Sequence, residues 1–198
     1  MSDDTTQPSA PPRAKVKILD VLKRAERAVF TRPAPKSARA QMKFLLTCAK
    51  GSTKAVAAGL GVSRSTVERY LSGASKKPQK RLQAALVKET EAEWQPQVRT
   101  QTRQRAATSA GLVISCRAYF GFGPEGTSDA GRARDLTVAV APSHAAAILT
   151  AQETGATDSD LHKLVAEALA DAYFRQGGGG RAGLEVKFTD VEWLNISF

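Results

Sequence analysis

The sequence holds few of the side chains that bind metals or form disulfides. Among its 198 residues there are two cysteines, Cys48 and Cys116, and two histidines, His144 and His162. The cysteines lie far apart without a C-x-x-C motif, and the histidines have no partners at ligand spacing, so the residues predict no metal site. Two lone thiols are typical of a protein from a reducing compartment.

Long apolar runs are also missing. No run approaches the roughly 18 residues that a membrane-spanning helix needs. The segment 1–12 has no apolar core behind an early basic charge, which a secretory signal requires. We therefore expect a soluble, cytoplasmic protein with no membrane partner. Because residues 1–14 are polar and proline-rich, they are expected to be a disordered tail.

Enzyme signatures are absent as well. The sequence has no G-x-x-x-x-G-K-[ST] loop, no G-x-S-x-G elbow and no paired acids at metal spacing. The glycine run 177–180 is not followed by a predicted helix whose N-terminus could bind phosphate. The residues alone therefore predict no active site and no cofactor of the chain's own.

What the sequence does have is an uneven charge distribution. The chain carries 29 Lys and Arg against 19 Asp and Glu, a net charge of +10. Residues 1–110 hold 22 of those basic and 8 of those acidic residues, a net +14, whereas the remainder holds 7 and 11, a net −4. A strongly basic half beside a mildly acidic one is typical of a protein that binds a polyanion through one of two domains.

A helix-turn-helix pattern lies within the basic half, at residues 52–71. Ser52 or Thr53 can cap a first helix, Gly61 stands where the chain needs a turn, and Ser63 can cap a second helix. In the second helix Val67 and Leu71 share one face at i and i+4 and are expected to point inward. The pattern predicts a DNA-binding motif, and its alternative is a helical hairpin that only packs.

The segment 98–105 is almost wholly polar and cannot be a core helix. It is either a solvated linker or an arm that contacts phosphates, and the charge of the basic half favours the arm. The side chains expected at the DNA are basic or carry a hydroxyl: Ser52, Thr53, Lys54, Ser63, Arg64, Ser65, Thr66, Arg69, Lys76, Lys77, Arg99, Arg103 and Arg105.

The periodicity of the apolar residues predicts an α+β protein. Apolar spacing and proline breaks predict helices over 16–29, 38–50 and from Pro78 to Trp94, resumed to Ala107, so that 15–110 forms an all-helical DNA-binding domain. Residues 111–198 are expected to form a small antiparallel sheet with two helices, from strands at 112–120, 136–140, 184–188 and 191–198 and helices at 142–154 and 158–175. A sheet with one solvated face often serves dimerisation or partner docking. On these grounds alone, a dimeric helix-turn-helix transcription regulator leads.

Several stretches carry a resemblance to a known family. They occur in order at 30–45, 50–57, 66–70, 94–99, 111–114, 136–138, 155–157 and 184–190. These stretches resemble the telomere terminal proteins of actinobacterial linear chromosomes and plasmids. The resemblance covers nearly the whole chain from Ala14 onward, which makes it more specific than a helix-turn-helix pattern.

The resemblance implies a protein primer. In that family a polymerase links the first deoxynucleotide to a side-chain hydroxyl, and the protein stays attached to the 5′ end. The divalent metal and the nucleotide, dCTP, belong to the polymerase. The family's linking threonine follows the first strand of the C-terminal half, which corresponds here to Thr127, with Ser128 as the alternative.

The same resemblance implies the partners. They are the single-stranded 3′ overhang of the telomere, a telomere-associated protein, a DNA polymerase and a topoisomerase. A homo-oligomer is compatible with the sequence. The protein is then expected in the cytoplasm, associated with the nucleoid at the ends of linear replicons.

Overall fold

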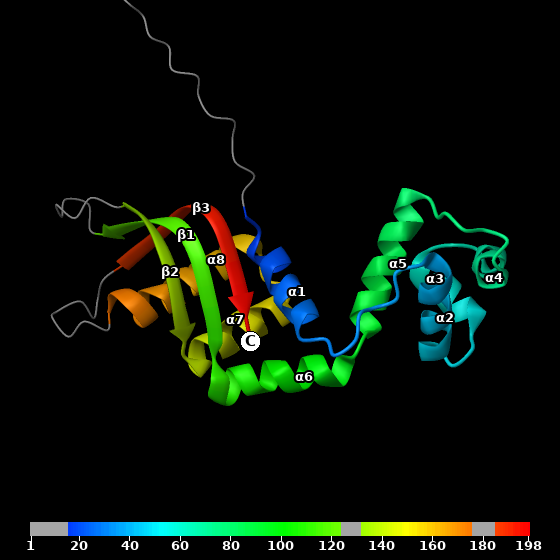
Figure 1. Ribbon diagram of the computed structural model, residues 1–198, viewed down its shortest axis with the longest axis horizontal. Helices are drawn as coiled ribbons and strands as arrows, with labels where there is room; N and C mark the ends of the chain where they lie inside the picture. Colours follow the sequence, from blue (N-terminus) through cyan, green and yellow to red (C-terminus); the bar gives the residue numbers. More distant parts are fainter. Residues whose placement is uncertain (1–15, 124–131, 176–184) are drawn as a thin grey trace, which may run out of the picture. The chain divides into compact units, whose positions relative to one another are not determined.

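The computed structural model describes residues 16–123, 132–175 and 185–198. The chain divides into two compact units, one formed by 1–29 and 101–198 and the other by Phe30–Thr100. Helices build the second unit, and a three-stranded antiparallel sheet with helices builds the first, so the expected α+β class is confirmed (Figure 1).

The unit of residues 30–100 contains four helices and the start of a fifth: α2 (Ala38–Cys48), α3 (Thr53–Leu60), α4 (Arg64–Ser72), α5 (Lys80–Glu93) and α6 (Pro96–Arg105). Three of these helices follow an N-cap serine. The hydroxyls of Ser37, Ser52 and Ser63 accept hydrogen bonds from backbone N–H groups in the first turn. The apolar core comprises Ala38, Met42, Leu45, Val56, Ala57, Leu60, Val67, Tyr70, Leu82 and Leu86.

The turn between α3 and α4 lies where the sequence predicted it. Gly61 ends α3 in the left-handed region with φ of 64°, a conformation that favours glycine. The inward face of α4 differs in one position, since Val67 and Tyr70 are buried while Leu71 is half-buried at the core's edge. Tyr70 can be buried because its hydroxyl donates to the carbonyl oxygen of Lys77 at 3.3 Å.

The other unit is built on the sheet, with strand order β2-β1-β3. The strands are β1 (Leu112–Gly123), β2 (Arg132–Val140) and β3 (Glu185–Ser197), and the helices are α1 (Ile18–Ala28), α7 (Pro142–Glu153) and α8 (Asp158–Leu169). Alternate residues of β1 are buried, namely Leu112, Ile114, Cys116, Ala118 and Phe120. The three helices pack on this face (Figure 1).

One strand replaces the two predicted at 184–188 and 191–198. The whole of β3 pairs with β1, with a bulge at which Thr189 faces Tyr119 and Trp193 faces Arg117. Asp190 lies in this bulge with φ of 46°, which explains why the sequence suggested a turn. The bulge adds two residues to β3. Because two is an even number, the same face of β3 stays inward on both sides of the bulge, and the pairing with β1 resumes after it.

The first helix belongs to a different unit from the one predicted. Its apolar spacing suggested that 16–29 is part of the helical domain 15–110, but Ile18, Val21, Leu22 and Ala25 are buried in the core of the sheet unit. The Leu19 N–H also donates to Asp158 Oδ1 at 3.1 Å. The unit boundaries therefore fall at Val29/Phe30 and within α6, because a helix's apolar face does not specify which partner covers it.

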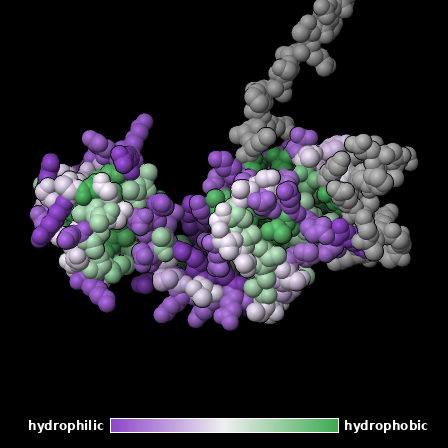
Figure 2. Space-filling model, turned by 180° about the vertical axis from the view of Figure 1, so that it is seen from behind, coloured by the Kyte–Doolittle hydropathy of each residue, from purple (hydrophilic) through white to green (hydrophobic). Residues whose placement is uncertain are grey.

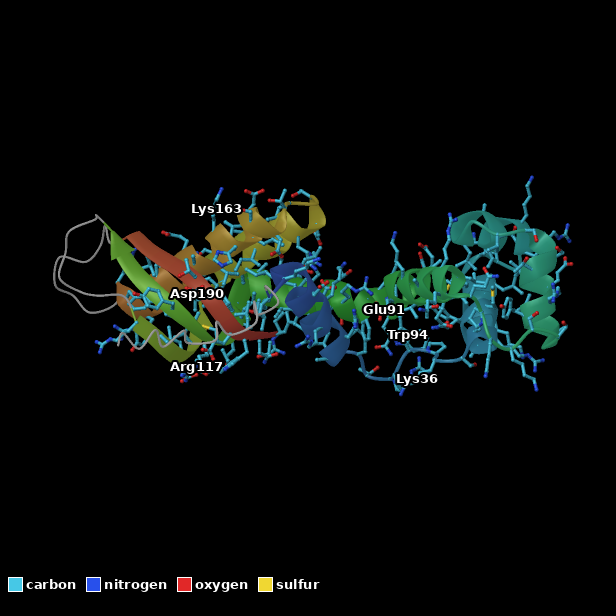
Figure 3. The ribbon with its side chains drawn as sticks, turned by 90° about the horizontal axis from the view of Figure 1, so that it is seen from above. Lys36, Glu91, Trp94, Arg117, Lys163 and Asp190 are labelled. Atoms are coloured by element: carbon cyan, nitrogen blue, oxygen red, sulfur yellow. The ribbon has the colours of Figure 1, made fainter. Side chains whose placement is uncertain are left out.

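The second face of the sheet carries no helix in the described part of the chain. Val113, Tyr119 and Trp193 are 38–43% exposed on it. Arg117 bridges the strands by ion pairs with Asp135 and Glu192. Figure 3 shows Arg117 on this side of the unit. The face is mixed in charge and partly apolar, which is typical of a sheet that also contacts other molecules.

Gly111 gives the first testable prediction, because it joins the helical segment to β1 with φ of 71° and ψ of −158°. That region is essentially restricted to glycine, and an added Cβ would stand 1.9 Å from the Val140 carbonyl oxygen. We expect Gly111→Ala to lower the free energy of unfolding by about 3 kcal/mol or more, as backbone strain and overpacking add. Thermal and urea unfolding measure this change.

Gly155→Ala is the matched control. Gly155 also has a positive φ of 77°, but an added Cβ meets nothing within 4 Å. The control therefore carries backbone strain alone and is expected to cost about 1–2 kcal/mol. Equal losses of stability in the two variants would contradict the steric role of Gly111.

Candidate nucleic-acid interface

The two units carry very different charges. Residues 30–100 hold 14 Lys and Arg against 4 Asp and Glu, a net +10, whereas 1–29 and 101–198 together hold 15 of each. The whole net charge of the chain therefore belongs to the four-helix unit. Figure 2 shows its long hydrophilic side chains projecting between paler and apolar atoms. This concentration of positive charge makes the unit the candidate interface for a polyanion.

The outward face of α4 carries three of the predicted contacts. Arg64, Ser65 and Arg69 are exposed, as is Glu68. Arg64 Nε donates to Glu68 Oε1 at 3.0 Å, with the two side chains 70% and 53% exposed. A pair this exposed adds little stability and can open toward a phosphate.

Three hydroxyls gather at the first turn of α4. Ser63 Oγ accepts from the Thr66 N–H and lies 2.9 Å from both Ser65 Oγ and Thr66 Oγ1. Ser52 Oγ caps α3 in the same way by accepting from the Ala55 N–H. The capping hydroxyls position the helix starts, whose remaining N–H groups favour anions.

The remaining basic candidates flank these helices. Lys54 is exposed in the first turn of α3, next to the half-buried Thr53, and Lys76 and Lys77 are exposed on the segment between α4 and α5. The Tyr70 hydroxyl holds this segment through the Lys77 carbonyl. Lys76 and Lys77 can therefore contact a ligand from a backbone that is anchored to the core.

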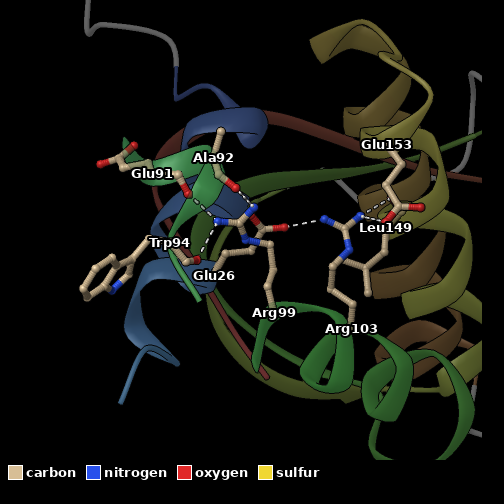
Figure 4. Close-up of polar contacts among 8 residues, drawn as sticks. All are labelled: Glu26, Glu91, Ala92, Trp94, Arg99, Arg103, Leu149 and Glu153. Atoms are coloured by element: carbon tan, nitrogen blue, oxygen red, sulfur yellow. Dashed lines mark hydrogen bonds and ion pairs between the residues drawn. The ribbon is translucent and has the colours of Figure 1, made fainter. Parts of the chain in front are cut away.

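Arg99 has a role in the fold that the sequence did not predict. Its guanidinium donates to the carbonyl oxygens of Glu91, Ala92 and Trp94 at the end of α5 (Figure 4) and lies 5.7 Å from the centroid of the Phe30 ring. These carbonyls are the groups that a helix leaves unpaired at its C-terminus. Arg99 thus caps α5, and its contact with DNA stays a prediction.

Arg103 is likewise an internal residue. Its side chain is 14% exposed, forms an ion pair with the 12% exposed Glu26, and donates to the Leu149 carbonyl oxygen at 2.8 Å. It also lies 3.0 Å from Glu153 (Figure 4). The solvated-linker alternative is therefore wrong at Arg103, and a contact of this residue with phosphates stays a prediction. Arg105 is exposed and remains a candidate.

Sequence reasoning missed Arg39 as a positioning residue. Its Nε donates to the Leu71 carbonyl oxygen at 3.1 Å, which ties α2 to the last turn of α4. The contact satisfies a carbonyl that the helix leaves unpaired. No local signal could have revealed it, because Arg39 and Leu71 are 32 positions apart and Arg39 is otherwise an ordinary exposed base.

The predicted priming hydroxyls, Thr127 and Ser128, lie outside the described residues. The strands that flank them, β1 and β2, form an antiparallel pair whose register extends to Phe120 and Arg132. Another hydroxyl of this unit, that of Thr137 in β2, donates to Ser115 Oγ at 3.1 Å.

The surroundings of the cysteines and histidines are those of residues that serve the fold. Burial raises the pKa of the Cys116 thiol to about 11, and burial and Glu93 raise the pKa of Cys48. His144 Nε2 lies 2.7 Å from Asp171, and His162 packs against Phe188. Among the described residues no three His, Cys, Asp or Glu side chains are grouped so that they could hold a metal ion. Within the same ranges, no helix has the length and apolar character to cross a membrane.

The exposed face of α4 generates a prediction about DNA binding. Replacing Arg64 and Arg69 with alanine should weaken binding by about 1–3 kcal/mol for each arginine that reads a base. For an arginine that neutralises a phosphate, the replacement should flatten the salt dependence by about one unit. Fluorescence anisotropy over a salt series measures both. Lys163→Ala removes an exposed cation from the neutral unit and is the matched control (Figure 3). Unchanged affinity and salt slope in the folded double variant would remove α4 from the interface.

Arg103 should behave in the opposite way. Arg103→Met leaves the Glu26 carboxylate buried without this guanidinium, and breaking such a pair costs about 3–5 kcal/mol. Urea unfolding should therefore show a large loss of stability in the variant. DNA affinity and its salt slope, measured below the transition, should equal those of the unmodified chain. A flattened salt slope would show that Arg103 contacts DNA after all.

The chain was compared with known proteins in three ways. Neither a scan against protein-family models nor searches of the curated proteins and the solved structures found a match.

Proposed function

We propose that this protein is a telomere terminal protein, which binds the end of a linear replicon and primes the synthesis of its last stretch of DNA. The observation that carries the proposal is the confinement of the net charge of +10 to residues 30–100. A primer needs one part that grips the template and another that presents a hydroxyl. The ordered resemblance of the chain to terminal proteins supports the same division.

The basic unit is the proposed template-binding part. The helix α4 presents Arg64, Ser65 and Arg69, and Lys76 and Lys77 follow on the next segment. Arginine and hydroxyl side chains are the groups that most often contact phosphates and base edges. Since Arg99 and Arg103 hold groups of the fold, the proposed interface is centred on α4, the start of α3 and the segment before α5, with Arg105 as a further candidate.

The hydroxyl of Thr127 is the proposed primer. Its oxygen attacks the α-phosphorus of dCTP, an O–P bond forms, and the bond to the leaving pyrophosphate breaks. The hydroxyl proton passes to a base or to solvent. The polymerase's two metal ions would activate the hydroxyl and stabilise the leaving group, so this chain contributes the acceptor and its position.

A second function is favoured by the uncovered face of the sheet. Tyr119 and Trp193 are 39% and 43% exposed there. Exposed aromatic side chains beside a mixed-charge surface are typical of protein interfaces. This face supports the alternative of a transcription regulator that dimerises through the sheet and binds DNA reversibly.

A labelling experiment tests the primer. The full chain is incubated with a telomeric 3′ overhang, polymerase, partner protein and labelled dCTP. We expect label on the protein that survives boiling in detergent, because a phosphodiester to threonine is covalent. Thr127→Ala should abolish the label without changing DNA binding, and Thr127→Ser should retain part of it because an alcohol is still present.

Controls separate the alternatives. Thr137→Ala removes a strand hydroxyl that is bonded to Ser115, and it should label normally. If Ser128→Ala abolishes the label while Thr127→Ala does not, the acceptor moves by one residue and the function stands. If the Thr127/Ser128 double variant labels like the unmodified chain, this segment is not the priming site. A regulator would instead leave terminal DNA free to extract into the aqueous phase without protease treatment.

A further inference from the structure

The unit of residues 30–100 contains a groove that the proposed DNA contacts do not use. It lies between α2, α3 and α5 and has a volume of about 230 Å³. Leu45, Val56 and Leu60 form its apolar floor, and Glu89 and Glu93 of α5 line it. The volume is suited to one or two large apolar side chains, and the carboxylates favour a cation beside them.

Gly59 has no side chain, and this leaves space over the groove. It lies inside α3, where glycine costs a helix about 1 kcal/mol relative to alanine. Nothing within the chain requires the glycine, since an added Cβ would meet no atom within 4 Å and its φ is not positive. The missing side chain leaves the groove open on the side of α3, which allows close approach by another molecule.

Glu89 and Glu93 are placed where they weaken their own helix. They lie at i and i+4 on α5, an arrangement in which like charges repel each other. Glu93 ends the helix, where the helix dipole is already negative and the Arg99 guanidinium caps the free carbonyl oxygens rather than these carboxylates. Neither carboxylate has an ion-pair partner among the described residues. Their position is explained if they meet positive charges from outside the chain.

The groove is also electrostatically distinct from the rest of its unit. Of the four acidic residues in 30–100, Glu68 lies on α4, and Glu89, Glu91 and Glu93 lie on the second half of α5. A polyanion is therefore repelled at the end of α5 while it is attracted to α4. Figure 1 shows α4 on the far side of α3 from α5, so that the two surfaces can be occupied together.

We propose that this groove binds a basic amphipathic helix of a partner protein. A leucine, methionine or phenylalanine of the partner enters the groove over Gly59, and lysine or arginine one turn away on the same helix pairs with Glu89 and Glu93. Helix-in-groove recognition requires this combination of an apolar anchor and flanking charges. Charge complementarity excludes DNA and an acidic peptide as the occupant.

A model peptide tests the proposal. A 14-residue helical peptide of leucine and lysine is titrated into the isotopically labelled full chain, and its leucine–glutamate counterpart is the control. We expect amide shifts in solution NMR to concentrate on the ends of α2 and α3 and on α5, with the basic peptide only. Glu89→Gln together with Glu93→Gln should weaken binding about tenfold, whereas Glu68→Gln should not change it.

A pair of steric variants tests the place of binding. Gly59→Leu fills the groove and should abolish binding, while Ala58→Leu adds the same side chain at an exposed neighbour that does not line it. Both variants remain helix-compatible. Alkylation of the exposed Cys48 at the rim should also block binding without any change of sequence, because Cys116 is buried.

Three outcomes would overturn the proposal. The basic peptide can shift the α4 resonances alone, it can bind Gly59→Leu as well as the unmodified chain, or the leucine–glutamate peptide can bind equally. Shifts at the groove that grow with protein concentration, with no peptide present, would identify a second copy of the chain as the occupant and overturn the basic partner helix.

Discussion

The burial of the Arg103 guanidinium is the interaction on which the division of this molecule depends. A charge held at 14% exposure must be paired, and its partners are Glu26 of α1 and the end of α7. The pairing joins α1 to the sheet unit together with the buried face of Ile18, Val21, Leu22 and Ala25, although α1 precedes the basic helices in the chain. Residues 30–100 are thereby left as a separate unit with its own core.

This division separates the charges of the chain. The four-helix unit keeps all of the net positive charge, and the sheet unit is neutral. Within the four-helix unit the charge is divided again, because three of the four acids cluster on the second half of α5 beside an apolar groove. A basic face and an acidic groove on one small unit suit two ligands of opposite charge, DNA and a basic protein segment in our proposals. The segment proposed for priming belongs to the neutral unit, where the template's phosphates are not strongly held.

Local signals predicted much of the fold. Ser52 and Ser63 cap helices and Gly61 ends one, because a cap needs only its own side chain and an N–H three residues away. The composition of 112–120 and the apolar pattern of 136–140 also predicted the strands β1 and β2. The bulge at Asp190 was misinterpreted as a strand break, since a local turn signal cannot show that β1 continues to pair on both sides of it.

The sequence by itself therefore determined the helices, the caps of α3 and α4, the strands β1 and β2 and the surplus of positive charge, since each depends on neighbours a few residues away. Only the tertiary structure decided which unit α1 joins and that Arg99 and Arg103 serve the fold. It also decided that Gly59, Glu89 and Glu93 line one groove. The physical reason is that the environment of a charge is set by distant residues, as with Arg103, whose partners lie 77 and 46 positions away. Periodicity identifies an apolar or charged face, but packing alone selects what that face meets.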